Sequence, residues 1–163
     1  MPNYCTNIVD IVGNKKDIQE IWDKYRTQDE GLLDEPCLSF NKILPRPEEL
    51  KDSCGWSIEN WGTKWDICSC YNSEIYLSYP ESSMNFNYDT AWGPGDKVLM
   101  HLSKLYPEIE ITLEYYEMGC MFAGKAKFKA GEVIDDFYTE DHDKLKAMYP
   151  DEFYLEDEEQ VNN

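Results

Sequence analysis

The stretch EIEITLEYYEMGCMFAGKAKFKAG, residues 108–131, indicates an antiparallel hairpin and thereby predicts a sheet. Both halves alternate apolar and charged residues, glutamates in the first and lysines in the second, as strands with one buried face do. A turn at Met118-Gly119 brings the two alternations into one register. The expected cross-strand pairs are Glu114 with Lys125 and Glu110 with Lys129 on the solvent side, and Ile111 with Phe128 on the buried side. The lysine row is therefore interpreted as cross-strand partners and edge protection rather than as an anion site.

Patterns before the hairpin predict two helices and two further strands. CTNIVDIVGN (5–14) is rich in β-formers and predicts a strand, whereas apolar residues recur every three or four positions in KKDIQEIWDKY (15–25), which predicts a helix. GPGDKVLMHLSKLYP (93–107) predicts a second helix that ends at its last proline. CLSFNKILP (37–45) alternates well enough to be expected as a strand.

Weaker patterns complete the set of elements. SEIYLSYP (73–80) and SMNFNYDTAW (83–92) resemble the two arms of a hairpin, and residues 64–70 are expected to enter a strand irregularly. A helix is expected at 141–149. We therefore predict an α+β, ferredoxin-like sandwich, with one antiparallel sheet, two helices on one face and an acidic C-terminal extension. Residues 1–155 are expected to form this single domain, followed by a disordered acidic tail at 156–163.

The charge balance limits the partners. The 163 residues contain 33 acidic and 15 basic side chains, giving a net charge of −18. Such a chain repels nucleic acid and anionic membranes, so direct binding to either is not expected, whereas basic proteins are attracted. Without a visible export signal, a cytoplasmic location in the host cell and reduced cysteines are expected.

Acidic residues concentrate toward the C-terminus, where residues 132–163 hold twelve of them and only two lysines. We interpret this segment as the contact surface for a basic partner. The candidate contact residues are Asp135, Asp136, Glu140, Asp141, Asp143, Glu156, Asp157, Glu158 and Glu159.

The tryptophan-rich stretch GWSIENWGTKWDICSC (55–70) raises a second possibility. Its rings suit a core joint between helix and sheet, but they could instead line a pocket for a nucleotide or another small molecule. The residues of that alternative pocket are Trp56, Trp61, Lys64, Trp65 and Trp92. Cys68 and Cys70 would share one face of a strand and could form half of a metal site, but their spacing is unusual for zinc, so neither a metal nor a cofactor is expected.

Three quoted segments resemble one protein family. PNYCTNIVDIVGN (2–14), WSIENWGTKWD (56–66) and TAWGPGDKVLMHLSKLYPEIEITLEYYEMGCMFAG (90–124) are together similar to the YubB ferredoxin-like domain family of phage, prophage and plasmid proteins. Tyr4, where a tryptophan is usual, and Gly95, where a second proline is common, depart from the family pattern. The resemblance implies a ferredoxin-like sandwich encoded by a mobile element, and it implies no catalytic residues.

No phosphate-binding glycine loop, dinucleotide fingerprint, zincin helix or serine elbow is present in the sequence. The leading hypothesis is therefore a non-enzymatic, nucleic-acid-mimicking interaction protein of a phage or mobile element. Its expected partner is a basic, nucleic-acid-binding host protein, such as a defence nuclease or a CRISPR-type protein. The alternatives are an enzyme or small-molecule binder that uses the tryptophan pocket and a metal-binding module at the two cysteines.

Overall fold

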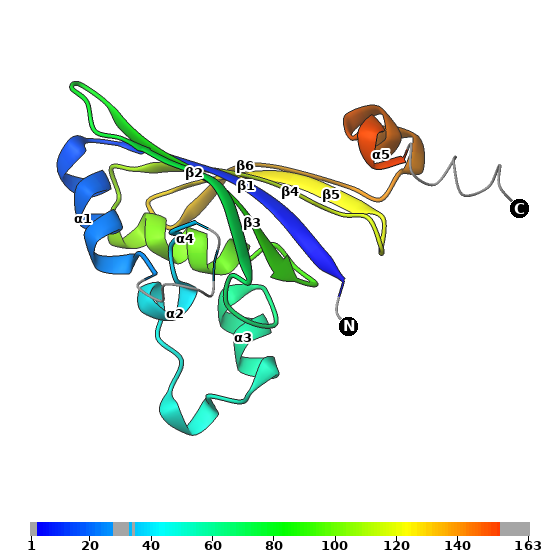
Figure 1. Ribbon diagram of the computed structural model, residues 1–163, viewed down its shortest axis with the longest axis horizontal. Helices are drawn as coiled ribbons and strands as arrows, with labels where there is room; N and C mark the ends of the chain where they lie inside the picture. The colour runs from blue at the N-terminus through cyan, green and yellow to red at the C-terminus, as the bar shows by residue number, and fades with distance from the viewer. Residues whose placement is uncertain (1–2, 28–32, 34, 154–163) are drawn as a thin grey trace, which may run out of the picture.

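The centre of the protein is a six-stranded antiparallel sheet (Figure 1). The structure, a computed structural model, describes residues 3–27, 33 and 35–153. Across the sheet the strand order is β2-β3-β1-β4-β5-β6. The strands are β1 (Tyr4–Gly13), β2 (Ser69–Tyr76), β3 (Ser82–Ala91), β4 (Glu110–Glu117), β5 (Phe122–Lys129) and β6 (Glu132–Thr139).

Helices lie on both faces of the sheet, but unequally. The helical elements are α1 (Lys15–Tyr25), α2 (Phe40–Ile43), the 3₁₀ turn η1 (Glu48–Leu50), α3 (Cys54–Trp61), α4 (Asp96–Leu105) and α5 (His142–Met148). Helices α1 to α4 lie on one side, here called the helix face, whereas α5 lies near the far end of β4 and β5 (Figure 1). The opposite side of the sheet, here called the open face, is contacted by α5 only at that end.

The topology is ferredoxin-like. The units β1-α1-β2 and β3-α4-β4 form a four-stranded core with the order β2-β3-β1-β4, and β5 and β6 extend this core beyond β4. The hydrophobic core lies between the sheet and α1 to α4. Val9 and Ile11 of the central strand and Ile18 of α1 are completely buried there, as is Leu102 of α4. Because alternate strand residues face opposite sides, the neighbours of Val9 and Ile11 project onto the open face.

The predicted hairpin is confirmed. β4 and β5 pair antiparallel with Glu114 opposite Lys125, Glu110 opposite Lys129 and Ile111 opposite Phe128. The strand at 5–14, both core helices and the C-terminal helix are also present, as β1, α1, α4 and α5. The two expected hairpin arms correspond to β2 and β3.

The strand expected at 37–45 is wrong. Phe40–Ile43 forms the short helix α2, whose N-cap Ser39 accepts a hydrogen bond from the backbone N–H of Lys42 at 3.3 Å. The carboxylate of Asp66 accepts further hydrogen bonds from Ser39 Oγ and from the backbone N–H of Phe40, both at 2.8 Å. This helix start is held by a residue 26 positions away in sequence, which local alternation does not register.

Two other elements were not expected from the sequence. Residues 54–61 form α3, which ends at Gly62 with a φ of +85°, a left-handed conformation that favours glycine. β6 forms an added edge strand at residues 132–139, where no strand was expected. Seven of its eight residues are exposed, so it lacks the alternation of a half-buried strand.

Candidate interaction surface

The acidic C-terminal candidates that the structure describes lie on β6 and α5. Asp135 and Asp136 belong to β6, Glu140 and Asp141 to the connection that follows, and Asp143 to the first turn of α5. All five are exposed. The remaining four candidates, Glu156, Asp157, Glu158 and Glu159, lie outside the described residues.

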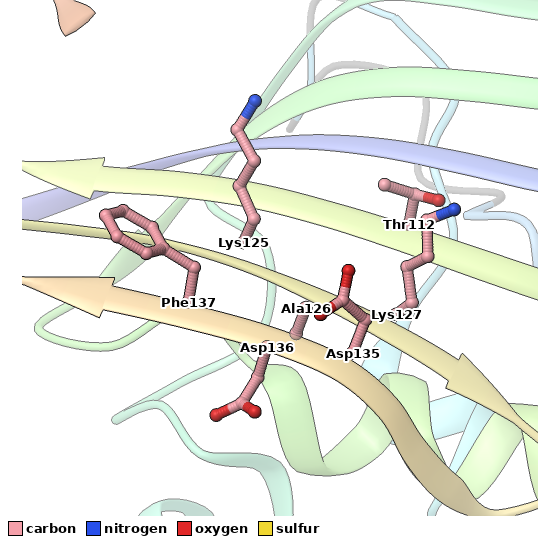
Figure 2. Close-up of a pocket in the computed structure, with 7 residues that line it drawn as sticks. All are labelled: Thr112, Lys125, Ala126, Lys127, Asp135, Asp136 and Phe137. Carbon is pink, nitrogen blue, oxygen red and sulfur yellow. The ribbon is translucent and has the colours of Figure 1, made fainter.

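These five carboxylates do not form one patch. Asp135 and Asp136 are consecutive on a strand and point to opposite faces of the sheet (Figure 2). Asp141 is the N-cap of α5 and accepts a hydrogen bond from the backbone N–H of Lys144 at 2.9 Å. Glu140 accepts a hydrogen bond of 2.6 Å from the Tyr138 hydroxyl, which is the main reason that the pKa of Tyr138 is raised to about 12. Asp141 and Glu140 thus have local structural roles.

Strand register places a second, larger group of carboxylates on the open face. Each strand except β5 contributes at least one, and β5 contributes three lysines. The acidic members are Asp10, Glu74, Asp89, Glu110, Glu114, Glu132 and Asp135, and the basic members are Lys125, Lys127 and Lys129. The open face of the sheet therefore has more carboxylates than ammonium groups, and its net charge is negative.

Two of the three lysines of β5 contact glutamates of β4. Lys125 Nζ lies 2.8 Å from Glu114 Oε2, which is the pair that the register predicts. Lys127 Nζ lies 3.5 Å from Glu110 Oε1, a diagonal contact, although the Cα partner of Glu110 is Lys129. Lys125 and Lys127 are thus cross-strand partners of glutamates, as the sequence indicated for this row.

Asp135 and Asp136 line a shallow hollow where β4, β5 and β6 run side by side (Figure 2). Thr112, Lys125, Ala126, Lys127 and Phe137 complete its lining. Lys127 is the cross-strand neighbour of Asp135, but its ammonium contacts Glu110 instead. Within the described part of the chain, neither aspartate has an ion-pair partner. Both carboxylates are therefore available to an incoming basic side chain.

Asp89 is a partly buried carboxylate of the open face. Thr6 Oγ1 donates a hydrogen bond of 3.1 Å to it across the β1–β3 pair. Burial raises the pKa of Asp89, whereas hydrogen bonds from Thr6 and Ser69 oppose this rise. Asp89 is therefore less suited to an external contact than Asp10, which is exposed on the neighbouring strand.

The residues of the alternative tryptophan pocket separate into two groups. Trp61 is 1% exposed, donates from Nε1 to the Leu44 carbonyl at 2.9 Å and packs edge-on against Trp56 with ring centroids 5.5 Å apart. Lys64 Nζ instead lies 5.1 Å from the ring centroid of Trp65 and 4.2 Å from that of Trp92, two cation–π contacts. Trp61 is therefore a core residue, and Lys64 is already engaged by two indoles.

Two comparisons relate this architecture to known proteins. The family model described as "Ferredoxin-like domain in Api92-like protein" matches residues 64–161, which is more than half of the chain. The chain belongs to this family. The matched Api92-like range includes β2 to α5, so the two added strands and the C-terminal helix lie within the matched residues.

A solved structure has the same fold as this Api92-like chain. The crystal structure of the protein api92 from Yersinia pseudotuberculosis matches with a TM-score of 0.56 and 10% identity, over 85% of this chain and 98% of that one. At this identity the likeness concerns the fold alone. No curated protein matches the chain. The ferredoxin-like part of the expected resemblance is thus confirmed, whereas the YubB assignment and the mobile-element origin stay predictions.

The two cysteines proposed as half of a metal site do not act together in the Api92-like domain. Cys70 is buried and its Sγ lies 3.8 Å from the Pro36 carbonyl oxygen, whereas Cys68 Sγ lies 3.2 Å from the carbonyl oxygen of Asp89. Among the residues that the structure describes, no three His, Cys, Asp or Glu side chains form a cluster suited to a metal ion. Over the same residues, no helix is long and apolar enough to cross a membrane.

Sequence reasoning missed part of the open face. Asp10 and Glu74 were not among its candidates, although their strands were predicted. The alternation in β3 did indicate which of its residues point away from the core, and Asn85, Asn87 and Asp89 share that side. What the sequence lacked was the strand order, which places β1 between β3 and β4 and so joins these side chains to the glutamates of β4.

Proposed function

We propose that this protein is a non-enzymatic interaction protein of a phage or mobile element, and that its acidic sheet binds a basic, nucleic-acid-binding host protein. In this proposal the carboxylates occupy the place of nucleic-acid phosphates on a defence nuclease or a CRISPR-type protein. The observation that carries it is the open face, where seven carboxylates and three lysines have positions fixed by strand register.

A sheet is a suitable support for such a surface. Neighbouring strands are about 4.8 Å apart and alternate residues along a strand about 6.6 Å apart, so the side chains of one face form a regular array. Two of the glutamates are neutralised by β5 lysines, whereas Asp10 and Asp135 have no ion-pair partner within the described residues. A basic surface that docks here gains charge pairs without displacing existing ones, and electrostatic attraction speeds its encounter.

The test is partner capture with matched variants. The full chain is immobilised and incubated with a nuclease-treated lysate of the bacterial host at low and at moderate salt, and retained proteins are identified by mass spectrometry. We expect a nucleic-acid-binding protein that is released by raised salt and by added duplex DNA.

An open-face variant and a control variant with the same change in charge locate the contact. Asp10→Asn/Glu74→Gln removes two carboxylates of the open face, and Glu49→Gln/Asp52→Asn removes two between α2 and α3. Capture should weaken for the first variant and persist for the second. Recovery of no nucleic-acid-binding protein at either salt, or an equal loss with both variants, contradicts the proposal.

A further inference from the structure

β6 combines an edge position with a concentration of exposed apolar side chains. Val133 and Ile134 are each 50% exposed, Phe137 is 42% exposed and Tyr138 is 54% exposed. Of the twelve large apolar residues that are exposed in the described chain, these four lie on one strand of eight residues. Single exposed apolar side chains are ordinary, but a cluster of four on a sheet edge suggests a contact surface.

The two edges of the sheet differ in what covers them. At the β2 edge, the Ser73 backbone N–H donates to the Glu35 carboxylate and Ser73 Oγ donates to the Pro36 carbonyl at 2.7 Å. The segment around Pro36 therefore occupies part of that edge. Within residues 3–27, 33 and 35–153, no segment pairs with the outer side of β6. Its outward N–H and C=O groups can form a ladder with an added strand.

A second copy of the chain is a poor occupant of this edge. Centred antiparallel pairing of β6 with itself places Asp135 opposite Asp136 of the other copy, and a shift by one residue places an aspartate opposite the same aspartate. Like charges directly opposite each other destabilise a strand pair. The chain's own last residues are equally unsuitable by charge, since four of them, 156–159, are acidic.

Each face of β6 carries a carboxylate next to an aromatic ring. On the open face Asp135 is followed two residues later by Phe137, and on the helix face Asp136 is followed by Tyr138. A residue on an added strand reaches both its direct neighbour and the diagonal one. Arginine fits this pair better than lysine, because its guanidinium can bind a carboxylate and stack on a ring.

We propose that an extended segment of the basic partner adds to β6 as a seventh strand, with two consecutive arginines opposite Asp135 and Asp136. The arginines point to opposite faces, and apolar residues on either side cover Val133, Ile134 and the two rings. The backbone ladder supplies affinity and the side chains supply selectivity, as in other strand additions. This inference rests on the proposed function, because it names the segment by which the basic partner is held.

Synthetic peptides test the inference with the full chain. The probe is a fluorescent eight-residue peptide, Ser-Val-Thr-Arg-Arg-Thr-Val-Ser, measured by anisotropy at moderate salt. Two further peptides have N-methyl groups on alternate backbone amides, one on each of the two alternating sets. We expect the parent to bind, one methylated peptide to lose binding and the other to retain it, because only one set of amides faces β6. A Lys-Lys peptide should bind more weakly, and a Glu-Glu peptide should not bind.

Variants of the chain provide the second part of the test. Asp135→Asn/Asp136→Asn should weaken binding of the Arg-Arg peptide about tenfold, whereas the equally charged control Glu49→Gln/Asp52→Asn should leave it unchanged. Equal binding of both methylated peptides, or no effect of the β6 variant, overturns the inference. The proposed function is then still decided by partner capture with Asp10→Asn/Glu74→Gln, since those residues lie on other strands. Conversely, if β6 binds the peptide but no nucleic-acid-binding protein is captured, strand addition at β6 is supported and the proposed nucleic-acid mimicry is refuted.

Discussion

The hydroxyl of Tyr149 donates a hydrogen bond of 3.0 Å to Oε1 of Glu114, and this contact joins the C-terminal segment to the open face of the sheet. The Tyr149 ring lies 4.3 Å from that of Tyr116, and Tyr116 in turn donates to Glu152 at 3.1 Å. Leu145 and Phe153 are buried in the same cluster. The acidic segment between β5 and residue 153 is therefore anchored at both ends, which fixes the carboxylates that it carries relative to the sheet.

Replacing Tyr149 by phenylalanine should loosen this anchor. Tyr149→Phe removes the hydrogen bond to Glu114 but keeps the ring contact with Tyr116, so we expect the free energy of unfolding to fall by about 0.5–1.5 kcal/mol. Urea unfolding measures the change, and hydrogen exchange of α5 amides shows whether it is local. Tyr79→Phe is the control, because Tyr79 is 93% exposed. The anchor is unimportant if the two variants are equally stable.

Alkaline pH should destabilise the same cluster. Burial, followed by the charge of Glu152, raises the pKa of Tyr116 from 10.0 to about 12. Because the unfolded chain loses this proton first, the stabilisation is complete below pH 10.0 and is lost as pH rises toward about 12. Urea unfolding at about pH 9 and about pH 11 should show this fall, and Tyr116→Phe should make it smaller. An unchanged pH dependence in that variant would refute the assignment.

The two tryptophan groups should differ in their effect on stability. Trp61→Ala removes a buried ring and leaves the Leu44 carbonyl without its donor, so a loss of about 3–5 kcal/mol is expected. Trp92 is 48% exposed, and Trp92→Ala removes its cation–π contact with Lys64, a loss of about 0.5–1 kcal/mol. Chemical denaturation separates these values. A small loss for Trp61→Ala would reopen the pocket interpretation.

Removing the two aspartates of β6 should increase self-association of the protein through this sheet edge. Asp135→Asn/Asp136→Asn abolishes the like-charge opposition that hinders pairing between copies, while Val133, Ile134 and Phe137 stay exposed. Light scattering at rising protein concentration should show stronger self-association than in the original chain. Asp143→Asn, a single change on α5, serves as the control and should leave association as it was. An unchanged second virial coefficient for the β6 variant counts against an accessible edge.

The sequence was sufficient to predict the elements that pack one apolar side against the hydrophobic core. In α1, α4 and the facing stretches 110–114 and 125–129 of the β4–β5 hairpin, the polarity of a residue indicates which side it faces, so period and register could be inferred locally. The pairing of Glu114 with Lys125 is an example, because two independent alternations agree on it. The acidic character of the candidate surface was likewise visible in the composition.

The edge strand β6, the helix α2 and the shared open face were decided by tertiary structure alone. β6 is buried on neither face and joins the sheet through backbone hydrogen bonds. Because backbone groups are common to all residues, the side chains of β6 show no periodic pattern of polarity. The start of α2 depends on Asp66, and the open face depends on a strand order that places β1 at the centre. Local polarity reports burial but not the partner across a strand edge. The acidic residues could therefore be counted from the sequence, whereas the surface that they share required the fold.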